Sequence, residues 1–322
     1  MSRSGSPVFA PPPFIFLGAL ALVPALLTEC LSPEPRDILF QAQQPGGTED
    51  IYALRLRDGA IRRLVRADTF SSRSLAAWSP DGRAIAFTRE FGDTAQLYVL
   101  DSLSGTPRRI VGGTLGFIAF PDWSPDGTRI LFSAGTHERY GVYLIGADGS
   151  GLRPVLRDTV TYRSPSWSPD GSEFAVSSYR NGRSEIRIVN LATGAQRTAL
   201  VADSTYVDFA QWSPRGDELL LTVYRGTQPL YDPEPREYGS SLAVLDLKTG
   251  RFTAITDGRG LNNYGRWSRD GRWIVFQSNR YEAARSDSIP LLESLEVYIV
   301  RRDGKQLRRL TMNTWFDGHP SW

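Results

Sequence analysis

The chain has 322 residues, 41% of them hydrophobic, which is enough to bury a substantial core in one large domain or two smaller ones. Its 37 basic and 35 acidic residues give a formal charge of +2 and form no basic block or stripe, so we expect no nucleic-acid partner. The 30 Gly and 21 Pro separate short alternating stretches rich in Ile, Val, Leu, Phe and Tyr. This pattern is typical of an all-β protein.

An export signal is predicted over residues 1–29. Residues 14–27 form an apolar run of 14 residues, which is short for a bilayer span and is broken by Pro24. The only cysteine, Cys30, follows in Leu-Thr-Glu-Cys, which resembles the lipobox of bacterial lipoproteins except that Glu29 replaces a small residue. We therefore expect Cys30 to be lipidated and to anchor the exported chain to an envelope membrane. A soluble exported form and an uncleaved anchor are the alternatives.

A tryptophan repeat runs through the rest of the chain. The pentapeptide Trp-Ser-Pro-Asp-Gly stands at residues 78–82, 123–127 and 167–171, and degenerate copies begin further along. The repeat tryptophans, separated by 45, 44, 45, 55 and 55 residues, are Trp78, Trp123, Trp167, Trp212, Trp267 and Trp322. Apolar residues stand seven and nine positions beyond each of the first five, as Ile85 and Phe87 do, which places both on one face of a strand.

Each repeat contains four predicted strands. One ends at the Trp, one follows the Ser-Pro-Asp-Gly turn, and two more are joined by a glycine hairpin such as Asp58-Gly59. Residues 31–322 are therefore predicted to form a six-bladed β-propeller of four-stranded antiparallel blades, with the Trp packed between adjacent blades. Because the chain starts with the second strand of a blade and ends with a first strand, residues 317–322 should pair with residues 37–42 and close the ring.

These repeats resemble those of the TolB-like β-propeller family over residues 31–322. In that family the propeller is periplasmic, follows a separate N-terminal α/β domain and binds the peptidoglycan-associated lipoprotein. Only a few residues separate Cys30 from the first predicted strand, so we expect this chain to lack the α/β domain. The resemblance implies an exported propeller that binds a protein in the cell envelope.

Two insertions account for the two longest repeat spacings. They span residues 224–240 and 279–294, and they fall on adjacent blades at the end of the ring where the loops are irregular. Tyr231 and Tyr238, interleaved with prolines, would form a rigid aromatic surface suited to protein recognition. The alternative is that the extra residues are tolerated loop without a role.

A polar funnel is predicted around the ring axis at the same end. It would be formed by residues four or five positions before a repeat Trp, together with His319, and would receive a segment of a partner or a small polar ligand. The predicted funnel residues are Arg73, Tyr162, Arg163, Asp208, Asn262, Asn263, Asp317 and His319. The alternative is a water-filled channel whose charges pair with one another.

Enzyme motifs are nearly absent from the sequence. It has no Gly-x-Ser-x-Gly elbow, no phosphate-binding loop and no His-Glu-x-x-His, and its histidines are His137 and His319 alone. We therefore expect no cofactor or metal and a monomeric, non-catalytic protein that binds an envelope protein or peptide. Two alternatives remain open: an envelope hydrolase or lyase that uses Asp208, Asp317 and His319, and a structural module of an envelope assembly.

Overall fold

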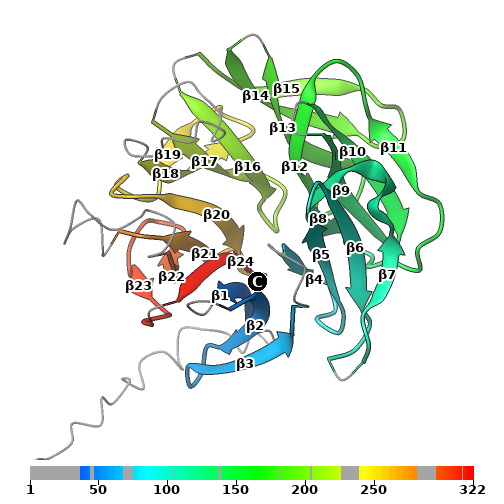
Figure 1. The fold of residues 1–322 in the computed structure, drawn as a ribbon. Coiled ribbons are helices and arrows are strands. Elements are labelled where there is room, and N and C mark those ends of the chain that lie inside the picture. The colour runs from blue at the N-terminus through cyan, green and yellow to red at the C-terminus, as the bar shows by residue number, and fades with distance from the viewer. Residues whose placement is uncertain are drawn as a thin grey trace, which may run out of the picture. The chain divides into compact units, whose positions relative to one another are not determined.

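The computed structural model describes residues 37–43, 47–67, 75–103, 105–136, 139–180, 182–203, 205–225, 239–280, 295–313 and 315–322. The chain divides into two units, Met1–Glu34 and Pro35–Trp322, and every described residue belongs to the second unit. That unit contains six antiparallel sheets of four strands, arranged as blades around a common axis (Figure 1). The predicted six-bladed propeller is confirmed. The signal peptide, Cys30 and the predicted start of the domain lie outside the described residues and stay predictions.

The blades are numbered in ring order, and each is given from its innermost strand outward. Blade 1 contains β24 (Phe316–Ser321), β1 (Ile38–Gln43), β2 (Glu49–Arg55) and β3 (Ala60–Val65), and blade 2 contains β4 (Ala76–Trp78), β5 (Ile85–Phe91), β6 (Thr94–Leu100) and β7 (Arg108–Val111). Blade 3 contains β8 (Phe117–Trp123), β9 (Arg129–Thr136), β10 (Arg139–Gly146) and β11 (Arg153–Leu156), and blade 4 contains β12 (Thr161–Trp167), β13 (Glu173–Arg180), β14 (Arg183–Asn190) and β15 (Gln196–Ala202). Blade 5 contains β16 (Tyr206–Trp212), β17 (Glu218–Tyr224), β18 (Ser240–Asp246) and β19 (Phe252–Ala254), and blade 6 contains β20 (Asn262–Trp267), β21 (Trp273–Ser278), β22 (Glu296–Arg301) and β23 (Arg308–Arg309).

The hydrophobic core lies between the blades. Among the described residues, six clusters of buried side chains each combine residues of two neighbouring blades, and a seventh, smaller cluster is centred on Tyr206, Phe209 and Tyr224 of blade 5. The apolar residues seven and nine positions beyond the Trp are fully buried in these clusters, as Ile130 and Phe132 show. Because a blade exposes apolar side chains on both faces, its stability depends on having a neighbour on each side.

Four of the six repeat tryptophans join adjacent blades through their indole N–H groups, whereas the indole nitrogens of Trp212 and Trp322 have no hydrogen-bond partner among the described residues. The indole of Trp123 donates to the carbonyl of Ala77 in blade 2 at 3.1 Å, and that of Trp167 donates to the carbonyl of Asp122 in blade 3 at 3.2 Å. The indole of Trp267 bonds in the same way to the carbonyl of Gln211 at 3.2 Å. The predicted position of the Trp between blades is therefore confirmed, and each of these bonds satisfies a donor that burial would otherwise leave unpaired.

The Ser-Pro-Asp-Gly segments form hydrogen-bonded turns. In blade 3 the hydroxyl of Ser124 donates to Asp126 at 2.5 Å and accepts the N–H of Arg129 at 2.9 Å, while Gly127 adopts φ +71°. The hydrogen bonds that Asp126 accepts from the Ser124 hydroxyl and from the backbone N–H and hydroxyl of Thr128 lower its pKa to about 2. In blade 5, where Arg215 replaces the aspartate, the Ser213 hydroxyl bonds to Asp217 instead. The motif is a turn.

The two ends of the propeller meet in blade 1. Strand β24 pairs antiparallel with β1, with Ala42 opposite Asp317 and Leu39 opposite Ser321. A hydrophobic cluster of residues from blades 6 and 1 covers the same junction. The predicted closure is confirmed. Within the described residues, no helix is long and apolar enough to cross a membrane, and η2 (Gly113–Leu115) is a single 3-10 turn.

A belt of buried polar residues surrounds the axis on the second strand of every blade. Each lies ten positions beyond a repeat Trp, or at the matching register in blade 1, and is at most 3% exposed. They are Gln41, Thr88, Ser133, Ser177, Thr222 and Gln277. The Thr88 hydroxyl accepts the backbone N–H of Leu75 at 3.1 Å, whereas the Thr222 hydroxyl has no hydrogen-bond partner among the described residues.

This difference predicts opposite outcomes for one substitution at two matched positions. Thr88→Val leaves the Leu75 N–H unpaired and should lower the free energy of unfolding by about 1–3 kcal/mol. Thr222→Val removes a buried hydroxyl that bonds to nothing described, so it should leave the free energy of unfolding within about 0.5 kcal/mol or raise it. Urea unfolding of both variants measures this. Equal destabilisation by the two would contradict the assigned hydrogen bonds.

Candidate functional site

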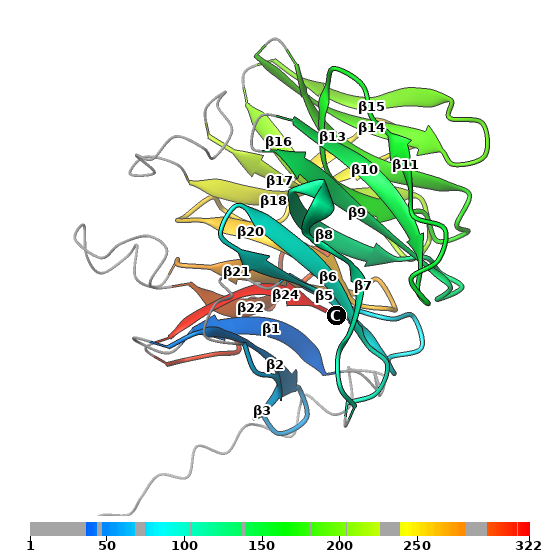
Figure 2. The same cartoon turned by 45° about the vertical axis from the view of Figure 1, so that its right-hand side comes forward.

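The irregular end of the ring carries the loops between second and third strands and the connections between blades. The Ser-Pro-Asp-Gly turns and glycine hairpins lie at the other end, because consecutive antiparallel strands reverse direction. Blades 5 and 6, whose second and third strands flank the two insertions, lie side by side (Figure 2). Of these insertions the structure describes only the bases, since Tyr231 and Tyr238 lie outside the described residues, as do Arg73 and His137. At these two insertions the structure therefore describes the residues that support the loops.

The innermost strands contain a left-handed bulge. In five of the six blades the third residue before the Trp, called position −3 below, has φ between 48° and 56°. These residues are Phe120, Ser164, Phe209, Tyr264 and His319. Three residues of the inner strand span two of the partner there, as between Ala119 and Asp122, so one extra residue is inserted. Left-handed backbone costs roughly 1 kcal/mol for a residue with a side chain, which makes the bulge a candidate functional feature.

The bulge brings aromatic side chains of different blades together across the axis. The ring of Phe209 from blade 5 lies 4.2 Å from that of Tyr264 in blade 6, and Tyr264 lies 4.2 Å from His319 in blade 1. Phe120 from blade 3 lies 5.2 Å from Phe209. We call Phe120, Phe209, Tyr264 and His319 the axial aromatic row. Only Phe209 is buried, at 7% exposure, and the other three rings are half-buried.

The predicted funnel residues lie mostly in the wall behind this row. Tyr162 is fully buried, donates its hydroxyl to Asp158 at 2.9 Å, and has its pKa raised to about 12, mainly by burial. The carboxylate of Asp208, 2% exposed, accepts the N–H of Phe209 at 2.7 Å. Asn263, 4% exposed, donates to the hydroxyl of Tyr224 at 3.4 Å. These side chains fix the bulge and the strands around it.

Asp317, Arg163 and His319 complete the predicted set. The carboxylate of Asp317 is fully buried and accepts the side-chain N–H of Asn313 at 2.7 Å, and burial raises the pKa of Asp317 to about 7. Arg163 is half-buried and stacks on the ring of Tyr140 at 4.8 Å. The backbone N–H of His319 donates to Gln277 at 2.6 Å. Of the predicted residues that are described, His319 alone belongs to the axial aromatic row.

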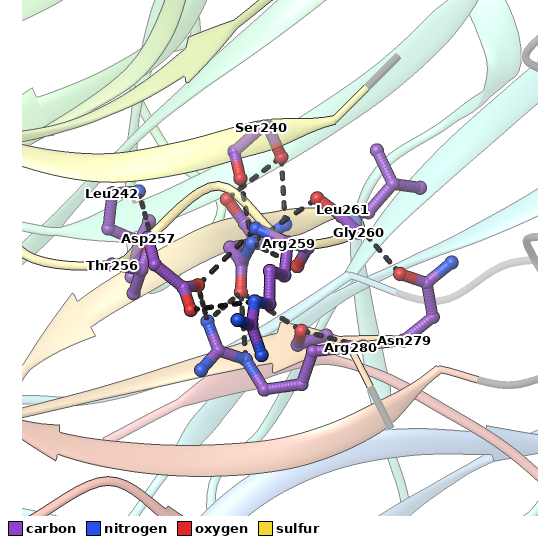
Figure 3. Close-up of polar contacts among 11 residues, drawn as sticks. Ser240, Leu242, Thr256, Asp257, Arg259, Gly260, Leu261, Asn279 and Arg280 are labelled. Atoms are coloured by element: carbon purple, nitrogen blue, oxygen red, sulfur yellow. Dashed lines mark hydrogen bonds and ion pairs between the residues drawn. The ribbon is translucent and has the colours of Figure 1, made fainter. Parts of the chain in front are cut away.

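Asn262 is the centre of a hydrogen-bond network that ties the bases of both insertions together. Figure 3 labels its partners Ser240, Arg259 and Arg280. Its amide N–H groups donate to the carbonyls of Ser240 at 2.7 Å and Arg259 at 2.9 Å. Its amide oxygen accepts from Arg280 at 2.8 Å. Ser240 follows the insertion of blade 5 and Arg280 precedes that of blade 6, so one buried side chain couples the two.

Arg280 and Asn279 complete this base. The Arg280 guanidinium also pairs with Asp257 at 3.1 Å, and the side-chain oxygen of Asn279 accepts the N–H of Leu261 at 2.8 Å. Side-chain exposure of Arg280 is 13%. A nearly buried guanidinium with two hydrogen-bonded partners is a rigid anchor, because moving it would leave several polar groups unpaired.

A charged contact crosses the axis nearer the turn end. Arg266 of blade 6 reaches Asp122 of blade 3, the blade directly opposite, at 3.3 Å, and it also donates to Gln211 of blade 5. Asp122 accepts the backbone N–H of Trp167 at 2.9 Å as well. Burial raises the pKa of the Asp122 carboxyl, while the facing guanidinium opposes that shift.

The sequence prediction overlooked this contact and the axial aromatic row. Aligning the repeats on the Trp would have revealed aromatic residues at position −3.

Metal binding has no support within the described part of the chain. There, His, Cys, Asp and Glu side chains do not gather in groups of three or more that could hold an ion. Asp208, Asp317 and His319, the three residues of the enzymatic alternative, each make contacts with the protein itself.

Comparisons with known proteins agree with the repeat pattern. Residues 133–285 match the family model described as the TolB beta propeller domain. An uncharacterized protein of Agrobacterium fabrum is 29% identical over 199 residues, which cover 60% of this chain and 65% of that protein. A Tol-Pal system protein TolB of Francisella tularensis is 24% identical over 205 residues, covering 63% of this chain and 45% of the relative. This chain therefore matches less than two thirds of the length of either relative.

Solved structures share the fold. The crystal structure of TolB from Acinetobacter baumannii superposes with a TM-score of 0.70 at 19% identity and covers 89% of this chain and 66% of its own. A putative TolB from Agrobacterium tumefaciens superposes with a TM-score of 0.65 at 18% identity. The match covers 88% of this chain and 91% of the Agrobacterium chain. The matched residues, the repeats and the six-bladed ring together make this chain similar to the TolB β-propellers.

Proposed function

We propose that this chain is an exported, non-catalytic propeller of the bacterial envelope that binds a protein or peptide at its loop-rich end. The observation that carries the proposal is the Asn262 network, which holds the bases of two long insertions in one rigid unit. Loops on a rigid base keep a binding surface in place and lower the entropy lost on association.

The axial aromatic row supplies contact chemistry beside that base. Phe120, Tyr264 and His319 are half-buried, so each presents part of its ring while the rest is held by its neighbours. Aromatic side chains that are already fixed lose little conformational entropy on binding and often dominate interface energies. A partner segment that reaches the axis would meet this row first.

Export and the envelope location rest on three further features. The predicted signal over residues 1–29 and the cysteine at position 30 support export with a lipid anchor. The similarity to a protein named for the Tol-Pal system supports a role in the same compartment. A catalytic role is less well supported, because the carboxylates of Asp208 and Asp317 already accept hydrogen bonds from side chains of the protein itself.

Partner capture tests the proposal. The purified protein, used as bait with an envelope extract of the source bacterium, should retain one or more envelope proteins. Tyr231→Ala/Tyr238→Ala should reduce recovery of that protein by about tenfold or more, the loss expected when aromatic contacts are removed from an interface. The matched control is Phe252→Ala, which removes a 45% exposed aromatic ring from the outer strand of blade 5. Equal recovery with all three baits would contradict the proposed surface.

Asp317 provides a separate test of a structural rather than a catalytic role. Its pKa of about 7 in the folded protein lies above the ordinary aspartate value of 3.8, so between these values the folded protein keeps a proton that the unfolded chain has lost. The free energy of unfolding should therefore fall as the pH rises from about 4 to about 7. Asp317→Asn should remove this slope, raise stability at pH 8 by roughly 1–3 kcal/mol and leave partner capture unchanged.

Thermal unfolding between pH 4 and pH 8 measures the effect, with Asp203→Asn as the control at an exposed carboxylate. A variant at position 317 that keeps the wild-type pH slope would show that Asp317 is not the group responsible. Loss of partner capture without loss of stability would instead place Asp317 in the binding surface.

A further inference from the structure

A groove of about 540 Å³ lies at the loop-rich end of blade 3. The 3-10 turn η2 and Gly116 form one side, the ends of β9 and β10 form the floor, and Arg157 and Asp158 form the other side. We call this feature the arginine groove. Its volume falls in the range typical of small-ligand sites. It belongs to a different blade from the two insertions and shares no residue with the Asn262 network.

The lining is rich in hydrogen-bond donors. Arg139 and Arg157 are both exposed, and neither has an ion-pair or hydrogen-bond partner among the described residues. The hydroxyls of Thr114 and Thr136 line the same groove. Two guanidinium forks and two hydroxyls facing one volume favour an oxyanion, since carboxylates accept paired N–H groups from arginine.

Asp158, the one acid among the described lining residues, is already hydrogen-bonded within the protein. Both carboxylate oxygens of Asp158 are already used: one accepts the N–H of Val160 at 2.7 Å and the other accepts the hydroxyl of Tyr162 at 2.9 Å. These bonds hold Asp158 against the inner strand of blade 4. Its fixed negative charge disfavours a dianion such as phosphate and is compatible with a single carboxylate.

The shape of the wall favours a peptide as the source of that carboxylate. Strand β11 pairs with β10 only over Val142–Leu144, so β10 continues beyond it at Arg139 and Tyr140. A side chain built on Gly135 would meet the carbonyl of Arg139 at 2.0 Å, so the floor at that point is backbone. Backbone at a strand end beside arginines is the setting in which proteins capture peptide termini.

We propose that the arginine groove binds the C-terminal carboxylate of a peptide, with Arg139 and Arg157 as the residues that pair with it. The inference rests on the proposed function in one respect, because it names the chemistry of one contact with a peptide or protein partner. Tyr162 and Arg163 act from behind the wall: Tyr162 holds Asp158, and Arg163 stacks on Tyr140.

Titration of the purified protein tests this without any natural partner. The probe is acetyl-trialanine with a free carboxylate, compared with the same peptide as a C-terminal amide, with glucuronate and with inorganic phosphate. We expect the free acid to bind and the amide to bind at least about tenfold more weakly, the usual consequence of losing charge-assisted hydrogen bonds. Arg139→Gln/Arg157→Gln should reduce binding of the acid to the same extent. Arg153→Gln, an exposed arginine on β11 outside the groove, is the matched control and should bind as wild type.

Each other outcome overturns the inference. Equal affinity for acid and amide would remove the carboxylate from the recognition, and unchanged binding by the double variant would place the site elsewhere. Binding of glucuronate or phosphate but not of the peptide acid would assign the groove to another ligand class. Because the probes are small and the protein is pure, a failure here leaves the partner-capture result intact, and a failure of partner capture leaves this titration interpretable.

Discussion

Six hydrophobic clusters among the described residues are each shared by two neighbouring blades, and this constraint controls the rest of the structure. A blade with one neighbour missing would expose the apolar residues that follow its Trp, at a cost of about 25 cal/mol for each Å² of apolar surface. The ring therefore has to close, and the pairing of β24 with β1 closes it. Four of the six repeat tryptophans, Trp78, Trp123, Trp167 and Trp267, reinforce the same interfaces, because their indole N–H groups bond to the preceding blade.

Closure also fixes the geometry of the inner strands, which carry the axial aromatic row. Five left-handed residues at position −3 are tolerated because the two adjacent blades hold each inner strand in place. The resulting bulges direct aromatic rings to the axis at one level, while Arg266 and Asp122 meet across it at another. The loop-rich end thus rests on a packed centre, which suits a surface that recognises a partner without rearranging.

The fold could be predicted from the sequence because its signals are local. A Trp, a Ser-Pro-Asp-Gly turn and two apolar residues seven and nine positions on specify a strand, a reversal and a buried face without reference to other blades. Even the degenerate copies keep the turn, since Asp217 replaces the missing acceptor for Ser213. The closing strand could be predicted because the repeats start with the second strand of one blade and end with a single first strand, which completes that blade.

The candidate site was less predictable because it depends on an interruption of that regularity. Residues four and five positions before a repeat Trp, such as Asn262 and Asp317, were expected to lie around the axis, but in the structure both are buried inside the wall, with the extra residue of the bulge between them and the Trp. The arginine groove is assembled from two inter-blade connections and a strand end, which no local pattern brings together. The positions of the long insertions were predictable, whereas their shared anchor at Asn262 required the structure.

The central claim is that the ring is one cooperative unit closed by its own C-terminal strand. Removing residues 316–322 and following thermal unfolding together with hydrogen exchange tests it most directly. The account predicts a single transition shifted down by about 10 °C or more, with lost amide protection in β1 and β21 as well as in strands of distant blades. A truncated protein that unfolds at the temperature of the intact one, with protection lost only in β1, would contradict the account.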